Sequence, residues 1–182
     1  MRCLTTFLVV LALTAWPLAD AAHARLSLDT DPWAEQGAVV EPLVIVVNRS
    51  NPVEDLSSAD LRTIFLGGRS HWVNGRRITL VMREPGEPER IAILHDVCGM
   101  NEDQLKTHFL RGLFTGEILV SPKTLASPAG VRRFIFNVPG AIGYLRQSDV
   151  DGSVKTIRID SLLPGDKGYK LHTENRVTNE NE

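Results

Sequence analysis

The sequence predicts an α/β domain in which helices pack on a central mixed sheet. Strand patterns alternate with amphipathic helical patterns along the chain, in the order βαβααα-ββ. The composition, with 43% hydrophobic residues and a formal net charge of −2 over 182 residues, is that of a globular protein rather than a disordered chain. No basic run is longer than two residues, so we expect no nucleic-acid partner.

The first 24 residues have the layout of a secretory signal peptide. Arg2 supplies a positive charge, residues 4–18 are almost wholly apolar or small, and residues 22–24 form an Ala-His-Ala cleavage triplet. The alternative is a membrane anchor, but the apolar run is shorter than the roughly 20 residues that a spanning helix needs. We therefore expect cleavage after residue 24 and a soluble protein in the periplasm, with Cys98 as its one cysteine.

The rest of the chain divides into three parts. Residues 25–42 form an irregular N-terminal arm of mixed polarity, residues 43–170 form the α/β domain, and residues 171–182 form a polar C-terminal tail. The tail lacks periodicity, so we expect it to be frayed.

The first strand and the first helix of the domain have clear local signals. Residues 43–47 form a continuous β-branched run, which predicts a strand covered on both faces. Ser57, with Asp60 three residues later, resembles the capping box of a helix that ends at the glycines 67–68. The apolar stripe of this helix consists of Leu61, Ile64 and Phe65.

The remaining elements follow from periodicity and caps. We expect strands over residues 78–82, 141–145 and 154–159, the last at a sheet edge. We expect helices over about 87–97, after the cap Asn101, and after Ser127-Pro128. The inward faces of the first two helices contain Ile91, Leu94 and Cys98, then Leu105, Phe109, Leu110 and Leu113.

The sequence gives no support for an enzyme, a cofactor or a metal site. Phosphate-loop, dinucleotide-binding, serine-hydrolase and zinc-protease motifs do not occur, and no acid, base and nucleophile set converges. His95 and Cys98 share a helix face, but a zinc site needs three or four ligands. Because Cys98 falls on the apolar stripe, we expect a buried thiol and neither metal binding nor catalysis.

Four residues between a buried strand and a helix form a candidate ligand site: Arg83, Gly86, Glu87 and Arg90. In open α/β sheets, ligands bind at the carboxyl ends of strands, where helix N-termini present unpaired N–H groups. Arginines add bidentate contacts to an oxyanion. The competing interpretation is that acids in the first helical turn stabilise the helix and pair with these arginines.

Two further residues are weaker candidates for the edge of the same pocket. Asn48 and Ser50 follow the first strand, as Arg83 follows the second. A separate anion site could use Arg132 and Arg133, or the helix cap at Ser127.

Six stretches of the chain, in order and in register, resemble the phosphate-binding proteins of ABC importers in the type 2 periplasmic binding protein superfamily. They are VVNRSNP (46–52), LSSADLRTIFLG (56–67), WVNG (72–75) with Ile78, Arg83 with Gly86, FTG (114–116) and PGAIGY (139–144). The resemblance is strongest to short, secreted, single-lobe relatives. It implies a single lobe of the type 2 periplasmic binding protein fold, which captures a small anionic solute such as phosphate and passes it to a membrane permease.

One departure from the family bears on the ligand. The family segment Arg-x-x-Gly-Ser-Gly-Thr holds phosphate, and here Arg83 and Gly86 match while Glu87, Pro88 and Glu89 replace Ser-Gly-Thr. A carboxylate about 4 Å from an anion costs roughly 1 kcal/mol in water and about 4 kcal/mol at an effective dielectric near 20. Proline also removes a backbone donor. Phosphate binding in the family's manner is therefore in question.

Two functions follow from this mixture of match and mismatch. One is a solute-binding module of the phosphate or oxyanion type that serves ABC import. The alternative is a ligand-sensing or protein-interaction module of the cell envelope that has lost phosphate binding and contacts a membrane sensor or transporter. In either case a single lobe cannot close over a ligand alone, so enclosure would need a homodimer or another partner.

Overall fold

The computed structural model describes residues 39–175. The predicted signal peptide, most of the predicted arm and the end of the tail lie outside these residues. No helix of the described part is long and apolar enough to cross a membrane.

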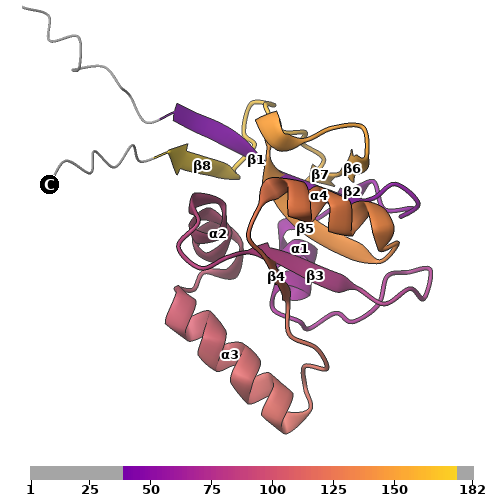
Figure 1. Ribbon diagram of the computed structural model, residues 1–182, viewed down its shortest axis with the longest axis vertical. Helices are drawn as coiled ribbons and strands as arrows, with labels where there is room; N and C mark the ends of the chain where they lie inside the picture. Colours follow the sequence, from indigo (N-terminus) through magenta and orange to yellow (C-terminus); the bar gives the residue numbers. More distant parts are fainter. Residues whose placement is uncertain (1–38, 176–182) are drawn as a thin grey trace, which may run out of the picture. The chain divides into compact units, whose positions relative to one another are not determined.

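A six-stranded mixed sheet forms the centre of the described chain (Figure 1). Its main path runs β4-β3-β5-β1-β6, and β8 also pairs with β1. β3 is parallel to β4 and β5, whereas β1 is antiparallel to β5, β6 and β8. The strands are β1 (Val39–Asn48), β3 (Thr79–Arg83), β4 (Lys123–Leu125), β5 (Ala141–Arg146), β6 (Val154–Thr156) and β8 (His172–Asn175). A small separate sheet pairs β2 (Asp55–Leu56) with β7 (Arg158–Ile159) in parallel.

Helices connect and cover these strands. They are α1 (Ser58–Phe65), α2 (Pro88–Ile93), α3 (Glu102–Thr115) and α4 (Pro128–Asn137), with a π-helical turn at Leu94–Cys98 and a 3-10 turn at Gln147–Asp149. The three predicted caps are confirmed, because the side chains of Ser57, Asn101 and Ser127 each accept a backbone N–H from the first turn of their helix. At Asn101 the capping box is complete.

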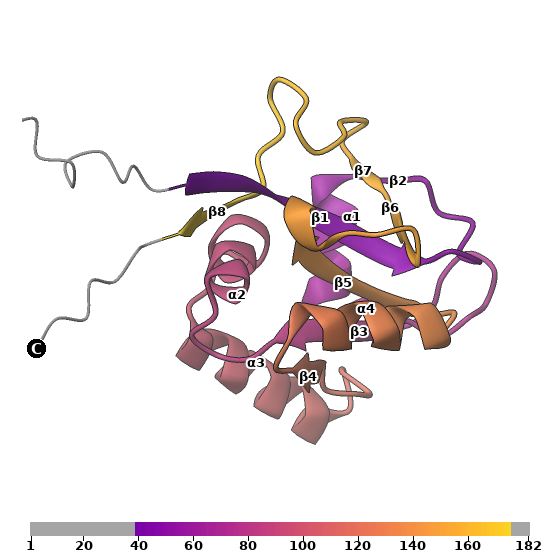
Figure 2. The ribbon, with the colours of Figure 1, turned by 45° about the horizontal axis from the view of Figure 1, so that its top comes forward.

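The alternation of side chains along β1 separates two hydrophobic cores. Leu43, Ile45 and Val47 face the larger core, which is shared with α1, α2, the π-helical turn and α3. Val44 and Val46 face the smaller core beneath α4. Helices therefore cover both faces of the sheet, with α4 on one side and α1 on the other (Figure 2). This arrangement explains why the 43–47 run is continuously hydrophobic, and it confirms the predicted fold class.

Three predicted inward positions are wrong. Ile91, Leu110 and Leu113 are exposed, although their helices form where the sequence places them. In α2 the neighbouring Glu89 and Arg90 are buried instead, because each makes ion pairs at the end of the sheet. α3 lies at the periphery, beyond β4 (Figure 1), and buries only a narrow stripe of Leu105, Phe109 and Gly112.

The strand boundaries also differ from the prediction. β1 begins at Val39, inside the predicted irregular arm, because it pairs with β8. β8 itself lies in the stretch that we expect to be a frayed tail. The predicted strand over 154–159 divides into β6 and β7, which belong to different sheets. Pairing partners far away in the sequence determine all three differences.

Candidate functional site

The candidate site lies where β3 and β5 end. Because these strands are parallel neighbours, Arg83 and Arg146 leave the sheet at the same edge. After Arg83 the chain turns at Gly86, whose φ of +90° is one that side-chain-bearing residues rarely adopt. Glu87 is then the N-cap residue of α2, and Pro88 occupies its first turn. The turn brings α2 directly onto the strand end.

Arg83 is buried and held on several sides. Its Nη2 atom lies 2.7 Å from Oε2 of Glu87, and its Nη1 donates to the carbonyl oxygen of Leu125 at 3.3 Å. Its backbone N–H donates to the hydroxyl of Tyr144 at 2.9 Å. Its Nε atom lies 3.9 Å from Oε2 of Glu89. The guanidinium group is therefore placed between the start of α2 and the end of β4.

Glu89 lies between two arginines. Its side chain is only 4% exposed, and Oε1 is 2.5 Å from Nε of Arg146, whose side chain is 21% exposed. Its other oxygen, Oε2, faces Arg83 but has no hydrogen-bond partner. The Nε atoms of both arginines also lack an acceptor of suitable geometry. The Glu89 carboxylate therefore offsets the positive charge of the two arginines but accepts no hydrogen bond of good geometry from their Nε atoms.

Arg90 completes the group of charges. Its Nε and Nη2 atoms donate to the two oxygens of Glu102, at 2.9 and 2.5 Å, and its Nη1 donates to the carbonyl of Arg83 at 2.7 Å. This bidentate geometry is the strongest form of the arginine–carboxylate pair. We call the six residues Arg83, Arg90, Arg146, Glu87, Glu89 and Glu102 the strand-end cluster. Their formal charges sum to zero.

Tyr144 supports the cluster from the sheet side. Its hydroxyl accepts the Arg83 N–H. Burial raises the pKa of this hydroxyl above the usual value. Its ring packs against Phe65 in the larger core, with ring centroids 6.0 Å apart. Tyr144 is thus a packed aromatic residue with a tethered hydroxyl.

The cluster contains three of the six predicted site residues, and a fourth, Gly86, forms the turn that joins Arg83 to α2. Arg83, Gly86, Glu87 and Arg90 lie in one turn and the helix that follows it, and their role in ligand binding stays a prediction. The competing interpretation, that these arginines pair with the acids of the first helical turn, holds for Arg83 but not for Arg90, which pairs with Glu102. Glu89, Glu102 and Arg146 were not among the predicted site residues. Glu102 comes from the start of the next helix, and Arg146 comes from the end of a strand far along the chain.

Asn48 and Ser50 do not belong to this cluster. Val47 and Leu80 both pair with Ile142, so Asn48 lies level with Thr79, at the amino end of β3. The offset from Arg83 along the sheet is about 13 Å. The expectation of a shared pocket edge is wrong, because β1 runs antiparallel to β3 and its carboxyl end therefore lies at the opposite edge.

Both residues have contacts of their own. The Asn48 amide donates to the carbonyls of Ile135 and Phe136 near the end of α4, at 2.8 and 2.7 Å, and its oxygen accepts from the N–H and hydroxyl of Ser50. Arg76 donates to the Ser50 hydroxyl at 2.9 Å. Asn48 therefore fixes the end of a helix to the end of a strand.

In the two alternatives for a separate anion site, Ser127 and Arg132 already have partners within the protein. Ser127 uses its hydroxyl to cap Gly130, and the guanidinium of Arg132 is engaged by Asp151, with Nε 3.2 Å from Oδ2, and by the carbonyl of Asp149. Arg133 is exposed.

His95 and Cys98 are also separated by burial. The His95 ring is exposed and lies 2.7 Å from the carboxylate of Asp96, whereas Cys98 is fully buried. Burial raises the pKa of the Cys98 thiol to about 11. Among residues 39–175, no group of three or more His, Cys, Asp or Glu side chains is arranged to hold a metal ion.

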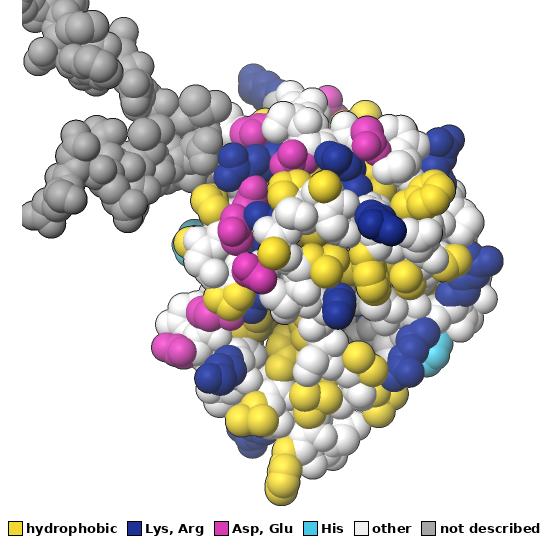
Figure 3. Space-filling view, in the orientation of Figure 1, with side chains coloured by type: hydrophobic (Ala, Val, Ile, Leu, Met, Phe, Trp, Pro, Cys, Tyr) yellow, Lys and Arg dark blue, Asp and Glu magenta, His cyan; other side chains and the backbone are white. Residues whose placement is uncertain are grey.

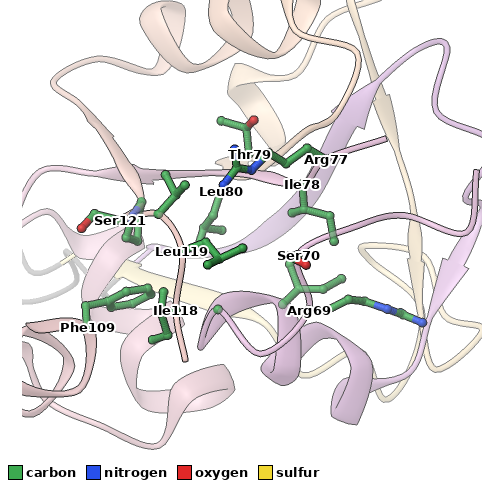
Figure 4. Close-up of a pocket in the computed structure, with 14 residues that line it drawn as sticks. Arg69, Ser70, Arg77, Ile78, Thr79, Leu80, Phe109, Ile118, Leu119 and Ser121 are labelled. Atoms are coloured by element: carbon green, nitrogen blue, oxygen red, sulfur yellow. The ribbon is translucent and has the colours of Figure 1, made fainter. Parts of the chain in front are cut away.

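Two surface hollows lie near α3. One, of about 210 Å³, has apolar lining from Leu80, Phe109 and Ile118, and the guanidinium of Arg69 points away from it (Figure 4). It contains no member of the strand-end cluster. The second, of about 310 Å³, runs between α3 and residues 121–124, and the Arg90–Glu102 pair forms part of its wall. Only the second hollow is continuous with the cluster.

Comparison with known proteins places the fold. No family model matches the chain. A phosphate ABC transporter substrate-binding protein from Clostridium perfringens, solved with bound phosphate, superposes with a TM-score of 0.62 at 22% identity, over 74% of this chain and 54% of that one. PstS from Borrelia burgdorferi superposes with a TM-score of 0.60 at 12% identity, over 75% of this chain and 56% of that one. An ABC-type phosphate transport receptor from Vibrio cholerae superposes with a TM-score of 0.50 at 21% identity, over 69% of this chain and 48% of that one.

These neighbours are substrate-binding proteins rather than enzymes, and the chain spans about half of their length. The superposed part includes a mixed sheet with helices on both faces, which corresponds to one lobe. At these identities the likeness concerns the fold. The described chain therefore has the fold of a single lobe of the phosphate ABC transporter substrate-binding proteins.

Proposed function

We propose that this protein is a secreted, non-enzymatic solute-binding-protein-like module that acts by protein–protein contact in the cell envelope and does not capture phosphate. The observation that carries the proposal is the pairing within the strand-end cluster. Each of its three arginines already has a carboxylate partner: Glu87 for Arg83, Glu89 for Arg146, and Glu102 for Arg90.

The electrostatics oppose a second anion at this place. An oxyanion that reached Arg83 would come within about 4 Å of Glu87 and Glu89, and each carboxylate would cost roughly 1 to 4 kcal/mol, depending on the effective dielectric. Micromolar affinity corresponds to about 8 kcal/mol. Two carboxylates can therefore remove most of the affinity that two arginines would supply.

A set of exposed apolar side chains supports the contact role. Large apolar side chains are exposed at the end of α3 and in the segment after it, namely Leu110, Phe114, Leu119 and Val120, with Phe114 93% exposed. Hydrophobic side chains gather at this end of the molecule in Figure 3. Monomeric proteins rarely expose large apolar patches, and such patches commonly mark surfaces that contact another protein.

Two measurements test the proposal together. Calorimetric titration of the chain without residues 1–24 should show no heat with phosphate at millimolar concentration. Cross-linking in the intact envelope, followed by mass spectrometry, should identify a partner that is lost when Leu110 and Phe114 are both replaced by Ser. Tight phosphate binding, or a monomer with no partner, would contradict the proposal.

The second candidate is phosphate capture for ABC import, with a permease as partner. The fold likeness to a structure with bound phosphate favours it. It predicts that the same titration gives at least micromolar affinity and that Arg83→Ala abolishes it. The phosphate titration therefore separates the two candidates.

A further inference from the structure

The outer face of α3 is apolar and exposed. It contains Leu110, Leu113 and Phe114, whose spacings of three and four residues place their side chains on one side of the helix. The segment after α3 continues the exposed apolar surface with Leu119 and Val120. Within residues 39–175 none of these five side chains belongs to either hydrophobic core. The packing of a single chain therefore does not explain them.

A hollow of about 310 Å³ lies beside this face. It runs between α3 and residues 121–124, and Phe109, Leu110 and Leu113 form part of its wall. Because a cavity of about 150 Å³ is enough to bind benzene, the hollow has room for a phenyl ring. Such a ring, that of the almost fully exposed Phe114, lies on the same helix. A two-fold interface is self-complementary, so the Phe114 ring of each copy can fill the hollow of the other.

The exposed charges of this surface select one antiparallel register of two α3 helices. Lys106 lies in the second turn of α3, and Glu117 follows the end of the helix. Both are exposed, and within residues 39–175 neither forms an ion pair. In antiparallel helices residue numbers rise along one copy and fall along the other. When Leu110 lies against Leu113 of the second copy, Lys106 therefore lies opposite Glu117 of the second copy.

The same register brings the ring and the hollow together. It places Phe114 of the second copy opposite Phe109, which is in the wall of the hollow. Two-fold symmetry forms each of these contacts twice. The register that pairs Leu110 with Leu110 of the second copy would instead place Asp103 opposite Glu117, and like charges that face each other oppose association.

We propose that α3 and residues 117–124 form a two-fold interface with a second copy of this chain. In this interface the α3 helices run antiparallel, the Phe114 ring of each copy enters the hollow of the other, and Lys106 pairs with Glu117 of the second copy. This inference rests on the proposed function, in which the protein acts by protein–protein contact, and it names the partner.

The first test measures association by sedimentation equilibrium. The chain without residues 1–24 should form a dimer at concentrations between about 1 and 100 μM. The variant Leu110→Ser/Phe114→Ser should weaken association at least about 30-fold, because large apolar side chains at the centre of an interface dominate its affinity. The matched control is Val73→Ser, which removes an exposed apolar side chain outside the proposed interface. A dimer that survives the double substitution, or equal weakening by the control, would overturn the interface.

The second test uses the two charges and needs no change in the apolar face. Lys106→Glu and Glu117→Lys should each weaken self-association about tenfold, since each variant places like charges opposite each other twice. An equal mixture of the two variants should associate as tightly as the unmodified chain, because both ion pairs form again with reversed sign. Lys167→Glu, at an exposed lysine outside the interface, changes the net charge equally and should have no effect. Failure of the mixture to restore association would overturn the antiparallel register.

The remaining outcomes separate this inference from the proposed function. A chain that stays monomeric at about 100 μM, while cross-linking still identifies a different envelope protein that depends on Leu110 and Phe114, overturns the inference and leaves the proposed function standing. Tight phosphate binding by the unmodified chain overturns the proposed function, whatever the sedimentation result.

Discussion

Replacing Glu89 with Gln should destabilise the protein strongly, because Glu89 is a buried charge between two arginines. Gln keeps the shape of the side chain but removes the charge that faces Arg83 and Arg146. Breaking a buried ion pair by removing one partner costs about 3–5 kcal/mol. Here Arg83 keeps Glu87, and Arg146 is partly exposed to water, so we expect about 2–3 kcal/mol.

This loss is a large share of the free energy of unfolding, which is about 5–15 kcal/mol for a typical domain. Urea unfolding followed by far-ultraviolet circular dichroism measures it directly, and in a thermal scan the melting temperature should fall by about 4–12 °C. The control is Glu54→Gln, whose exposed carboxylate pairs with Lys155 at 2.8 Å and should leave the urea midpoint unchanged. If Glu89→Gln lies within about 0.5 kcal/mol of the unmodified chain, the cluster does not hold the strand end and our account of it is wrong.

Three further predictions concern positions outside the cluster. Gly140→Ala should cost at least about 2 kcal/mol in urea unfolding, since its Cβ would lie 2.0 Å from the backbone oxygen of Arg77; an unchanged midpoint would contradict this. The Cys98 thiol, with its pKa raised to about 11 by burial, should react with a disulfide reagent at pH 8 only after unfolding, and rapid reaction of the native protein would refute that. Hydrogen bonds from Ser58 lower the pKa of Asp160, so the stability that this carboxylate adds is present above about pH 4 and disappears as pH falls through the lower folded value. Asp160→Asn should therefore be less stable than the unmodified chain at pH 7, and this gap should narrow as the pH falls below about 4; a gap that stays constant would count against this.

Local signals were enough to predict most elements of the fold. The uninterrupted apolar run at 43–47 requires cover on both faces, and the structure provides two cores for it. The pair Ser127-Pro128 predicts the start of α4 to the residue, because a cap and a proline act only on their own first turn. Each of these features is determined by a few neighbouring residues, so it can be predicted from the sequence alone.

The direction of a strand in the sheet is a different kind of information. The hydrophobic pattern of β1 is the same whether β1 runs parallel or antiparallel to β3. Asn48 and Ser50 follow a strand, as Arg83 does, yet they lie at the opposite edge because β1 is antiparallel to β5 and β3 is parallel to it. Residues that share a sequence context therefore need not share a site.

The acids at the start of α2 show how the structure decides between two interpretations that the sequence leaves open. If Glu87 served mainly to stabilise the helix, its side chain would accept an N–H from the first turn; it makes no such bond and instead lies 2.7 Å from Arg83. Glu89 lies in the first turn, where a carboxylate stabilises a helix even when exposed. Its burial against Arg146 goes beyond what helix stabilisation needs. The acids at 87 and 89, which depart from the family segment, are therefore best explained as counter-ions for Arg83 and Arg146. They take the place that an anion from solution would otherwise occupy.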